Sequence, residues 1–161
     1  MRGGPLPEGR MPFEIILRYT PPFNAYTDPD EALQEFLRLI GYLREEDATR
    51  DSVAYRLVRE CFTKNSGRAW TIEEMTAVLG TTKPTLYRHL NRLKALDVLE
   101  EAPLDKEVGK ARKGYRLRYG NLARAWDFTE ANIGNALKRY REAVDHIQGL
   151  LDTPPSTSGK K

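Results

Sequence analysis

The segment from Trp70 to Leu99 constrains the fold most, because it predicts two short helices joined by a tight turn. Thr71 and Glu74 are spaced as a capping box, in which the two side chains accept hydrogen bonds from backbone N–H groups at the start of a helix. Gly80 stands where a helix commonly ends in the left-handed conformation. The pattern therefore predicts one helix from Thr71 and a second helix over residues 82–96.

The second predicted helix has two different faces. On a helical wheel Leu86, Leu90 and Leu93 form one narrow stripe, which must face a core. The opposite side is polar, and the segment between Thr81 and Leu96 contains four cations and no acid. This helix is therefore predicted to be apolar towards its own protein and cationic towards solvent.

A cationic helix of this kind fits the major groove of B-DNA, where Arg can bind guanine, Asn can bind adenine and other cations can neutralise phosphates. The candidates for base contacts are Thr85, Tyr87, Arg88 and Asn91. The candidates for phosphate contacts on this helix are Lys83, Arg92 and Lys94. The alternative is a solvated Lys/Arg face on an ordinary three-helix core.

Two motifs resemble a known family. The sequences T-I-E-E-M-T-A-V-L-G and T-K-P-T-L-Y-R-H-L-N-R-L-K-A-L-D-V-L-E, which begin at Thr71 and Thr82, are similar to the helix-turn-helix of winged-helix transcription regulators, with the ArsR/MarR-like bacterial and archaeal members closest. The resemblance covers roughly residues 52–119 and implies a winged domain that binds double-stranded DNA. Asp97 stands where that family usually has Gly, and Asp tolerates a left-handed backbone moderately well.

Two strand-like runs follow, over residues 98–102 and 114–119, and predict a hairpin with a long tip at 103–114. Between Thr81 and Arg118 there are ten cations and five acids, so the positive charge of the chain is concentrated here. We expect the tip to lie over the backbone or the minor groove of DNA as a wing. A charged solvent loop is the alternative. The candidate wing cations are Lys106, Lys110, Arg112 and Lys113, with Arg116 and Arg118 along one face of the second strand.

Residues 121–151 predict a long C-terminal helix with an apolar seam whose members alternate steps of four and three. The seam could pack on the acidic N-terminal helix of its own chain or on the same helix of a second subunit, and we favour a homodimer because the helix outruns a small domain. A two-fold dimer would favour a palindromic DNA site. The seam comprises Trp126, Ile133, Leu137, Tyr140, Val144, Ile147 and Leu151.

The N-terminal part predicts a flexible leader at 1–11 and a unit at 12–50. In that unit, residues 13–19 predict a strand, which could pair with the sheet of the wing or with another subunit. Asp28 then predicts the start of an acidic helix that packs away from DNA. Residues 51–120 form the predicted winged domain, and 152–161 a disordered tail.

The composition excludes several classes of protein. The chain has one cysteine and two histidines, which are too few for an internal disulfide or a structural zinc site. Cys61 falls on the apolar stripe of a helix predicted over 51–62, so a core role is favoured over that of a peroxide-sensing thiol. We expect no cofactor, no metal and no enzymatic activity, because no phosphate loop or nucleophile–base pattern is visible.

The sequence contains no apolar run of about 18 residues and no signal-peptide pattern, which predicts a cytoplasmic, nucleoid-associated protein. The predicted fold class is mainly α with a small β-sheet. The predicted function is a sequence-specific, dimeric DNA-binding transcription regulator. A winged-helix protein-interaction module in a transcription or replication assembly is the alternative. No small-molecule effector can be named.

Overall fold

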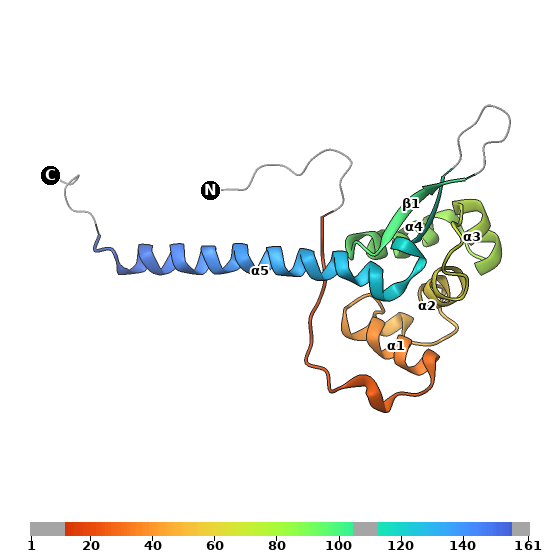
Figure 1. Cartoon of the computed structure of the whole chain (residues 1–161), viewed down its shortest axis with the longest axis horizontal. Helices are drawn as coiled ribbons and strands as arrows, with labels where there is room; N and C mark the ends of the chain where they lie inside the picture. Colours follow the sequence, from red (N-terminus) through yellow and green to blue (C-terminus); the bar gives the residue numbers. More distant parts are fainter. Residues whose placement is uncertain (1–11, 105–112, 156–161) are drawn as a thin grey trace.

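A computed structural model describes residues 12–104 and 113–155 of the chain. Short helices and one hairpin form a body, and a single long helix projects from it (Figure 1). The sheet has two antiparallel strands, and the remaining regular elements are helical. The predicted fold class, mainly α with a small β-sheet, is confirmed.

The N-terminal helix α1 spans Pro29–Leu39 and begins as predicted. The Asp28 carboxylate accepts hydrogen bonds from the first backbone N–H groups of α1, and this satisfies donors that have no partner within the helix. A short turn of 3-10 helix, Phe23–Ala25, precedes α1, and another, Glu45–Asp47, follows it. Leu37 of α1 is buried.

The first helix of the predicted winged domain has two parts. Helix α2, Val53–Arg56, is capped by the hydroxyl of Ser52, and it continues without a break into a π-helical stretch, Leu57–Thr63. The helix therefore starts two residues after the predicted Asp51, because Ser52 is the residue whose side chain accepts from the first turn.

Helix α3 spans Ile72–Leu79 and helix α4 spans Lys83–Ala95, close to the predicted positions. The strands β1, Leu99–Pro103, and β2, Lys113–Leu117, pair in antiparallel register with Leu99 opposite Leu117. Trp70 joins this sheet through a single bridge to Tyr115.

The second strand is shorter than predicted. Residues 118–119 leave the sheet in a tight turn, Arg118–Gly120, where Tyr119 has a φ of 59°. The Tyr119 N–H donates to the Glu100 carboxylate at 3.2 Å instead of to a strand carbonyl, which accounts for the early end of β2.

The predicted strand over residues 13–19 is wrong. The segment is extended, but its backbone hydrogen bonds run from Glu14 N–H to the Ala95 carbonyl and from Ile16 N–H to the Ile40 carbonyl. Both acceptors lie at the ends of helices, which offer isolated carbonyl groups and no ladder of alternating donors and acceptors. Ile15 packs against the core, whereas Tyr19 is exposed.

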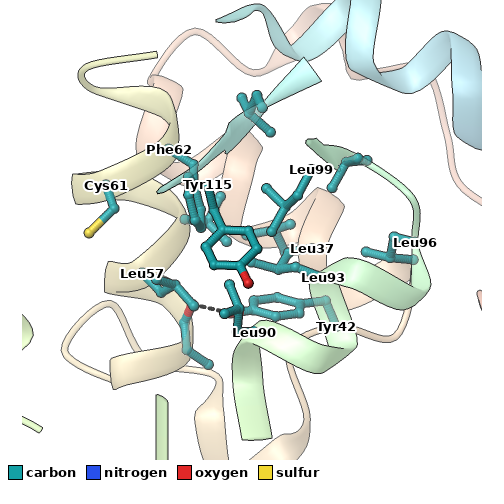
Figure 2. Close-up of a cluster of buried hydrophobic side chains, with 14 of the residues drawn as sticks. Leu37, Tyr42, Leu57, Cys61, Phe62, Leu90, Leu93, Leu96, Leu99 and Tyr115 are labelled. Atoms are coloured by element: carbon teal, nitrogen blue, oxygen red, sulfur yellow. Dashed lines mark hydrogen bonds between the residues drawn. The ribbon is translucent and has the colours of Figure 1, made fainter. Parts of the chain in front are cut away.

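The core is shared by the N-terminal helix and the predicted winged domain. Leu37 from α1, Phe62 from the π-helical stretch, Leu90 and Leu93 from α4, and Tyr115 from β2 meet in one buried cluster (Figure 2). The ring of Tyr42 lies next to Arg92 of α4, and the Tyr42 hydroxyl donates to the carbonyl of Ala54 at 2.6 Å. The acidic helix is therefore an integral part of the body.

Cys61 is fully buried in this core. Burial raises the pKa of its thiol to about 12, so the thiolate that reacts with peroxide is scarcely populated at neutral pH. The structure favours the core role for Cys61 over the role of a sensor thiol.

Helix α5 spans Leu122–Asp152 without a break, close to the predicted long C-terminal helix. Thr129 is fully buried, and its hydroxyl donates to the Leu96 carbonyl, so it anchors α5 on the C-terminal end of α4. Beyond this anchor the helix leaves the body (Figure 1).

Candidate nucleic-acid interface

The α3–turn–α4 unit is fixed by caps at three points. Thr71 and Glu74 form the predicted capping box, with hydrogen bonds of 3.0 and 3.1 Å. Gly80 ends α3 with a φ of 63°, and Thr82 caps α4 by accepting from the Thr85 N–H. Because Pro84 in the first turn of α4 has no N–H to satisfy, the short turn leaves few backbone donors unpaired.

Helix α4 buries one side and exposes the other. Leu86, Leu90 and Leu93 are buried, and Leu86 and Leu90 have no exposed surface. Tyr87 is 40% exposed and Arg88 is exposed. The α4 side opposite the leucines is therefore open to solvent in the part of the chain that the structure describes.

The predicted base-contacting residues lie together on the N-terminal two-thirds of this open side. Thr85 is half-buried and its hydroxyl bonds that of Thr82 at 3.2 Å. Asn91 is half-buried one turn beyond Arg88. Among residues 12–104 and 113–155, Arg88 forms no ion pair. Its guanidinium is free to bind an acceptor outside the protein.

Lys83 and Lys94 flank this set. Lys83 begins α4, is exposed, and pairs loosely with Glu73 at 3.4 Å. A pair between two exposed side chains contributes little stability, so it does not hold Lys83 away from other anions. The ammonium of Lys94 lies 4.6 Å from the ring centroid of Tyr115 and bonds its hydroxyl at 3.4 Å, which directs Lys94 towards the hairpin.

Arg92 does not lie on the open side, contrary to the sequence-based expectation of a phosphate contact. Its side chain is only 17% exposed, pairs with Asp47 at 3.2 Å and sits over the ring of Tyr42. Arg92 also contacts the ring nitrogen of His89, which is itself buried. Arg92 thus holds the turn after α1 against α4, because the Asp47 carboxylate compensates its charge there.

The cations of the hairpin are more fully paired than the sequence suggested. Arg116 pairs with Glu100 at 2.8 Å, and Arg118 pairs with Asp97 at 2.6 Å. Asp97 has the left-handed conformation that its position predicted, with a φ of 63°. The acids of β1 and the preceding turn therefore neutralise the two arginines that were predicted to line one face of the second strand.

The wing can be followed only in part. Lys113, at the start of β2, is exposed and pairs with Glu101 at 3.4 Å. The other predicted wing cations, Lys106, Lys110 and Arg112, lie outside the described residues, as do the predicted leader at 1–11 and the last part of the predicted tail.

The predicted seam of α5 divides into a packed part and an exposed part. Trp126 packs edge-to-face on Phe36 of α1, with ring centroids 5.4 Å apart, and Ile133 is half-buried. The first residue of the seam, Trp126, therefore meets the chain's own acidic helix, which is one of the two predicted interpretations. The remaining members project from the body with 52–72% of their surface exposed, namely Leu137, Tyr140, Val144, Ile147 and Leu151.

Sequence reasoning missed a second row beside this seam. Leu150 is 62% exposed, and Ala143 and Ala136 precede it at intervals of seven residues. Residues at this spacing share one side of a helix, so the exposed apolar face of α5 is wider than a two-position seam. The seven-residue spacing of these apolar residues would have revealed the second row from the sequence.

The space between α1 and α5 is filled. The cavity lined by Leu33, Phe36 and Trp126 has a volume of about 20 Å³, too small for an effector. A wider hollow of about 490 Å³, open to solvent, lies between residues 14–18 and the C-terminal end of α4, where Arg92 lines it.

Two features are missing from the described residues, namely a cluster of metal ligands and a helix that could cross a membrane. No group of three or more His, Cys, Asp or Glu side chains could hold a metal ion within them. Within the same residues, none of the helices combines the length and the apolar character that a membrane span requires.

The comparisons with known proteins agree with the local geometry. Residues 50–102 match a family model described as a helix-turn-helix domain. No curated protein and no solved structure matches the chain. The matched residues run from the turn before α2 to β1 and include both α3 and α4, so this part of the chain is similar to helix-turn-helix domains, and the similarity supports a DNA-binding regulator. The narrower ArsR/MarR-like assignment stays a prediction.

Arg92 and Arg88 have different surroundings, so their substitution should change the free energy of unfolding by different amounts. Arg92→Ala leaves the half-buried Asp47 carboxylate without its partner, so we expect the free energy of unfolding to fall by about 1–3 kcal/mol. Arg88→Ala removes an exposed side chain and should change it by less than about 0.5 kcal/mol. Urea unfolding followed by circular dichroism measures both; equal losses would contradict the assignment of Arg92 to the body.

The environment of His89 predicts a loss of stability in mild acid. Burial, and next the Arg92 guanidinium, lower the pKa of His89, so the folded protein holds it neutral. The unfolded chain takes up the proton below about pH 6.5, and the free energy of unfolding should therefore fall as the pH drops from 7 to 5. His89→Gln should flatten this dependence in urea titrations. The matched control His146→Gln, at an exposed position, should leave it unchanged.

Proposed function

We propose that this protein is a sequence-specific DNA-binding transcription regulator that inserts the open side of α4 into the major groove. The observation that carries the proposal is the division of α4: its leucines lie in the core, while Arg88 is exposed and unpaired among the described residues. A guanidinium in this state can form the two parallel hydrogen bonds that recognise guanine. The helix-turn-helix match over residues 50–102 supports the proposal.

In this proposal Arg88, Asn91 and Thr85 contact base edges, with Tyr87 at the margin. Lys83, at the N-terminal end of α4, contacts a phosphate, and the N-terminal end of the helix favours the same anion. Lys94 and Lys113 lie towards the hairpin and extend the cationic surface to the proposed wing, 103–114. Arg92 is omitted from the DNA contacts because Asp47 and the ring of Tyr42 occupy it.

We also propose that the protein is a homodimer through α5. The support is the exposed apolar face beyond Ile133, since a soluble chain gains free energy by covering large apolar side chains that lie next to one another. A dimer presents two copies of α4, and the two sites together bind a palindromic sequence more tightly than either alone.

A winged-helix protein-interaction module is the alternative function. The same exposed face of α5 favours it, because that face could bind a different protein instead of a second copy. An adaptor would bind DNA weakly and without sequence preference, so selection of bound fragments from random DNA, followed by titration at two salt concentrations, separates the two functions.

On a selected DNA site, Arg88→Ala should weaken binding by about 1–3 kcal/mol, with little change on random DNA, because it removes a base contact. Lys83→Ala should weaken both DNAs similarly and reduce the salt slope by about 1, because it removes a phosphate contact. Fluorescence anisotropy measures all four affinities. Arg139→Ala, an exposed cation on α5, is the control and should change none; equal effects of the first two variants on both DNAs would refute the division.

Charge placed on the exposed seam should separate the subunits. Leu137→Glu combined with Ile147→Glu buries acids in the proposed interface, so we expect a monomer in analytical ultracentrifugation and weaker binding to a palindromic site. Because both positions are more than half exposed in the single chain, the thermal stability of the body should not change. Lys138→Glu is the matched control. A wild-type chain that sediments as a monomer on its own would contradict the dimer.

A further inference from the structure

Helix α5 carries its exposed apolar face on the same side as the body, and this restricts how a second copy can bind. The residues that fasten α5 to the body are Ala125, Thr129 and Trp126. On a helical wheel these residues and the exposed seam point in directions that differ by less than about a quarter of a turn. The exposed seam of the projecting part of α5 therefore faces solvent on the same side as the body, and the body limits this open surface at the N-terminal end of the seam.

This geometry opposes a parallel pair of α5 helices. In a parallel pair the partner helix would run along the seam past Trp126, but that position is already filled by Phe36 of α1. Glu130 would also face its own copy, because it interrupts the seam at the next position, and like charges repel in an interface.

An antiparallel pair avoids both problems. The free part of the seam runs from Ile133, where α5 leaves the body, to Leu151, at the last turn of the helix. When this part lies along the same part of a second copy in the opposite direction, the body of each copy begins just beyond the C-terminal end of the other helix. The part of α5 that projects from the body, residues 133–151, is therefore as long as the stretch over which the two helices would pack.

The seam is self-complementary in this arrangement. With the two-fold axis level with residue 142, whose side chain faces away from the seam, every seam residue meets a seam residue of the second copy: Ile133 meets Leu151, Leu137 meets Ile147, and Tyr140 meets Val144. The largest side chain of the free seam is placed opposite the smallest, which fills the layer without a void or a clash.

The second apolar row fits the same register. Ala143 would approach Ala143 of the second copy, and Ala136 would lie opposite Leu150. The two Ala143 side chains are small, so the two backbones can come close there. Ala136 is also small, so it leaves room for the large Leu150 of the second copy. On the other flank Arg141 approaches its own copy, but Asp145 at 3.3 Å already pairs with it within each helix.

The geometry points to a dimer in which two α5 helices pack antiparallel along residues 133–151, with the two-fold axis level with residue 142 and a second copy of this chain as the occupant of the exposed face. This inference rests on the α5-mediated homodimer of the proposed function and specifies its orientation and register. With a rise of 1.5 Å per residue, the two Thr129 anchors would be about 39 Å apart along the helices, close to one turn of DNA.

Disulfide trapping tests the orientation. Each variant of the full chain carries one exposed cysteine in addition to Cys61, which stays reduced because it is fully buried. A tagged Leu137→Cys chain mixed with an Ile147→Cys chain should form a mixed disulfide under mild oxidation. Leu137→Cys alone should not cross-link, because its partner position is Ile147. Lys138→Cys, on the opposite side of α5, is the control and should cross-link with neither chain.

Native mass spectrometry and non-reducing gels give distinct outcomes. A mixed disulfide in at least tenfold excess over self-linked chains supports the antiparallel register. Self-linked Leu137→Cys dimers would show a parallel pair and overturn this inference while leaving the proposed dimer intact. A wild-type dimer without either cross-link would overturn the register alone. A wild-type chain that is monomeric at tens of micromolar would overturn both the inference and the proposed dimer.

Discussion

Burial of the leucine row of α4 is the interaction on which the rest of the structure depends. Leu86, Leu90 and Leu93 belong to one buried cluster that also contains Leu37 of α1 and Tyr115 of the hairpin. Each buried leucine contributes about 1.5–3 kcal/mol relative to its exposed state, so the row as a whole sets the rotation of α4 about its axis. Once that rotation is set, Arg88 must point to solvent.

Ion pairs then determine which cations remain available to a ligand. Arg92, Arg116 and Arg118 lie within reach of Asp47, Glu100 and Asp97 respectively, and each pair joins two elements of the body. Arg88 has no such neighbour among the described residues. Among the described residues, the cations without a close acidic partner are therefore fewer than the composition of the segment indicated, and Arg88 of α4 is one of them.

Helix α5 connects the two proposed functions of the chain. Thr129 fixes the helix to the last carbonyl of the α4 turn, and Asn132 bonds Asp97 at 2.7 Å in the turn that follows α4. The direction of the overhanging seam is therefore coupled to the position of α4, the helix proposed to read DNA. A second copy that binds the seam places its own α4 at a defined distance from the first.

The sequence by itself determined the local elements. The capping box at Thr71, the left-handed Gly80 and the cap at Thr82 are interactions between near neighbours, so their spacing predicted α3 and α4 closely, and the helix start at Asp28 followed in the same way. The long C-terminal helix and the burial of Cys61 were predicted from periodicity, which also depends on near neighbours.

Only the tertiary structure decided the remainder. Segment 13–19 has the alternation of a strand, but a strand exists only beside a partner, and this segment meets the ends of helices instead. Arg92 and Arg88 look equivalent along the sequence, and the turn after α1 separates them by placing Asp47 beside one of them. Pairing between residues distant in sequence cannot be read from local spacing, because it depends on how the core brings the elements together.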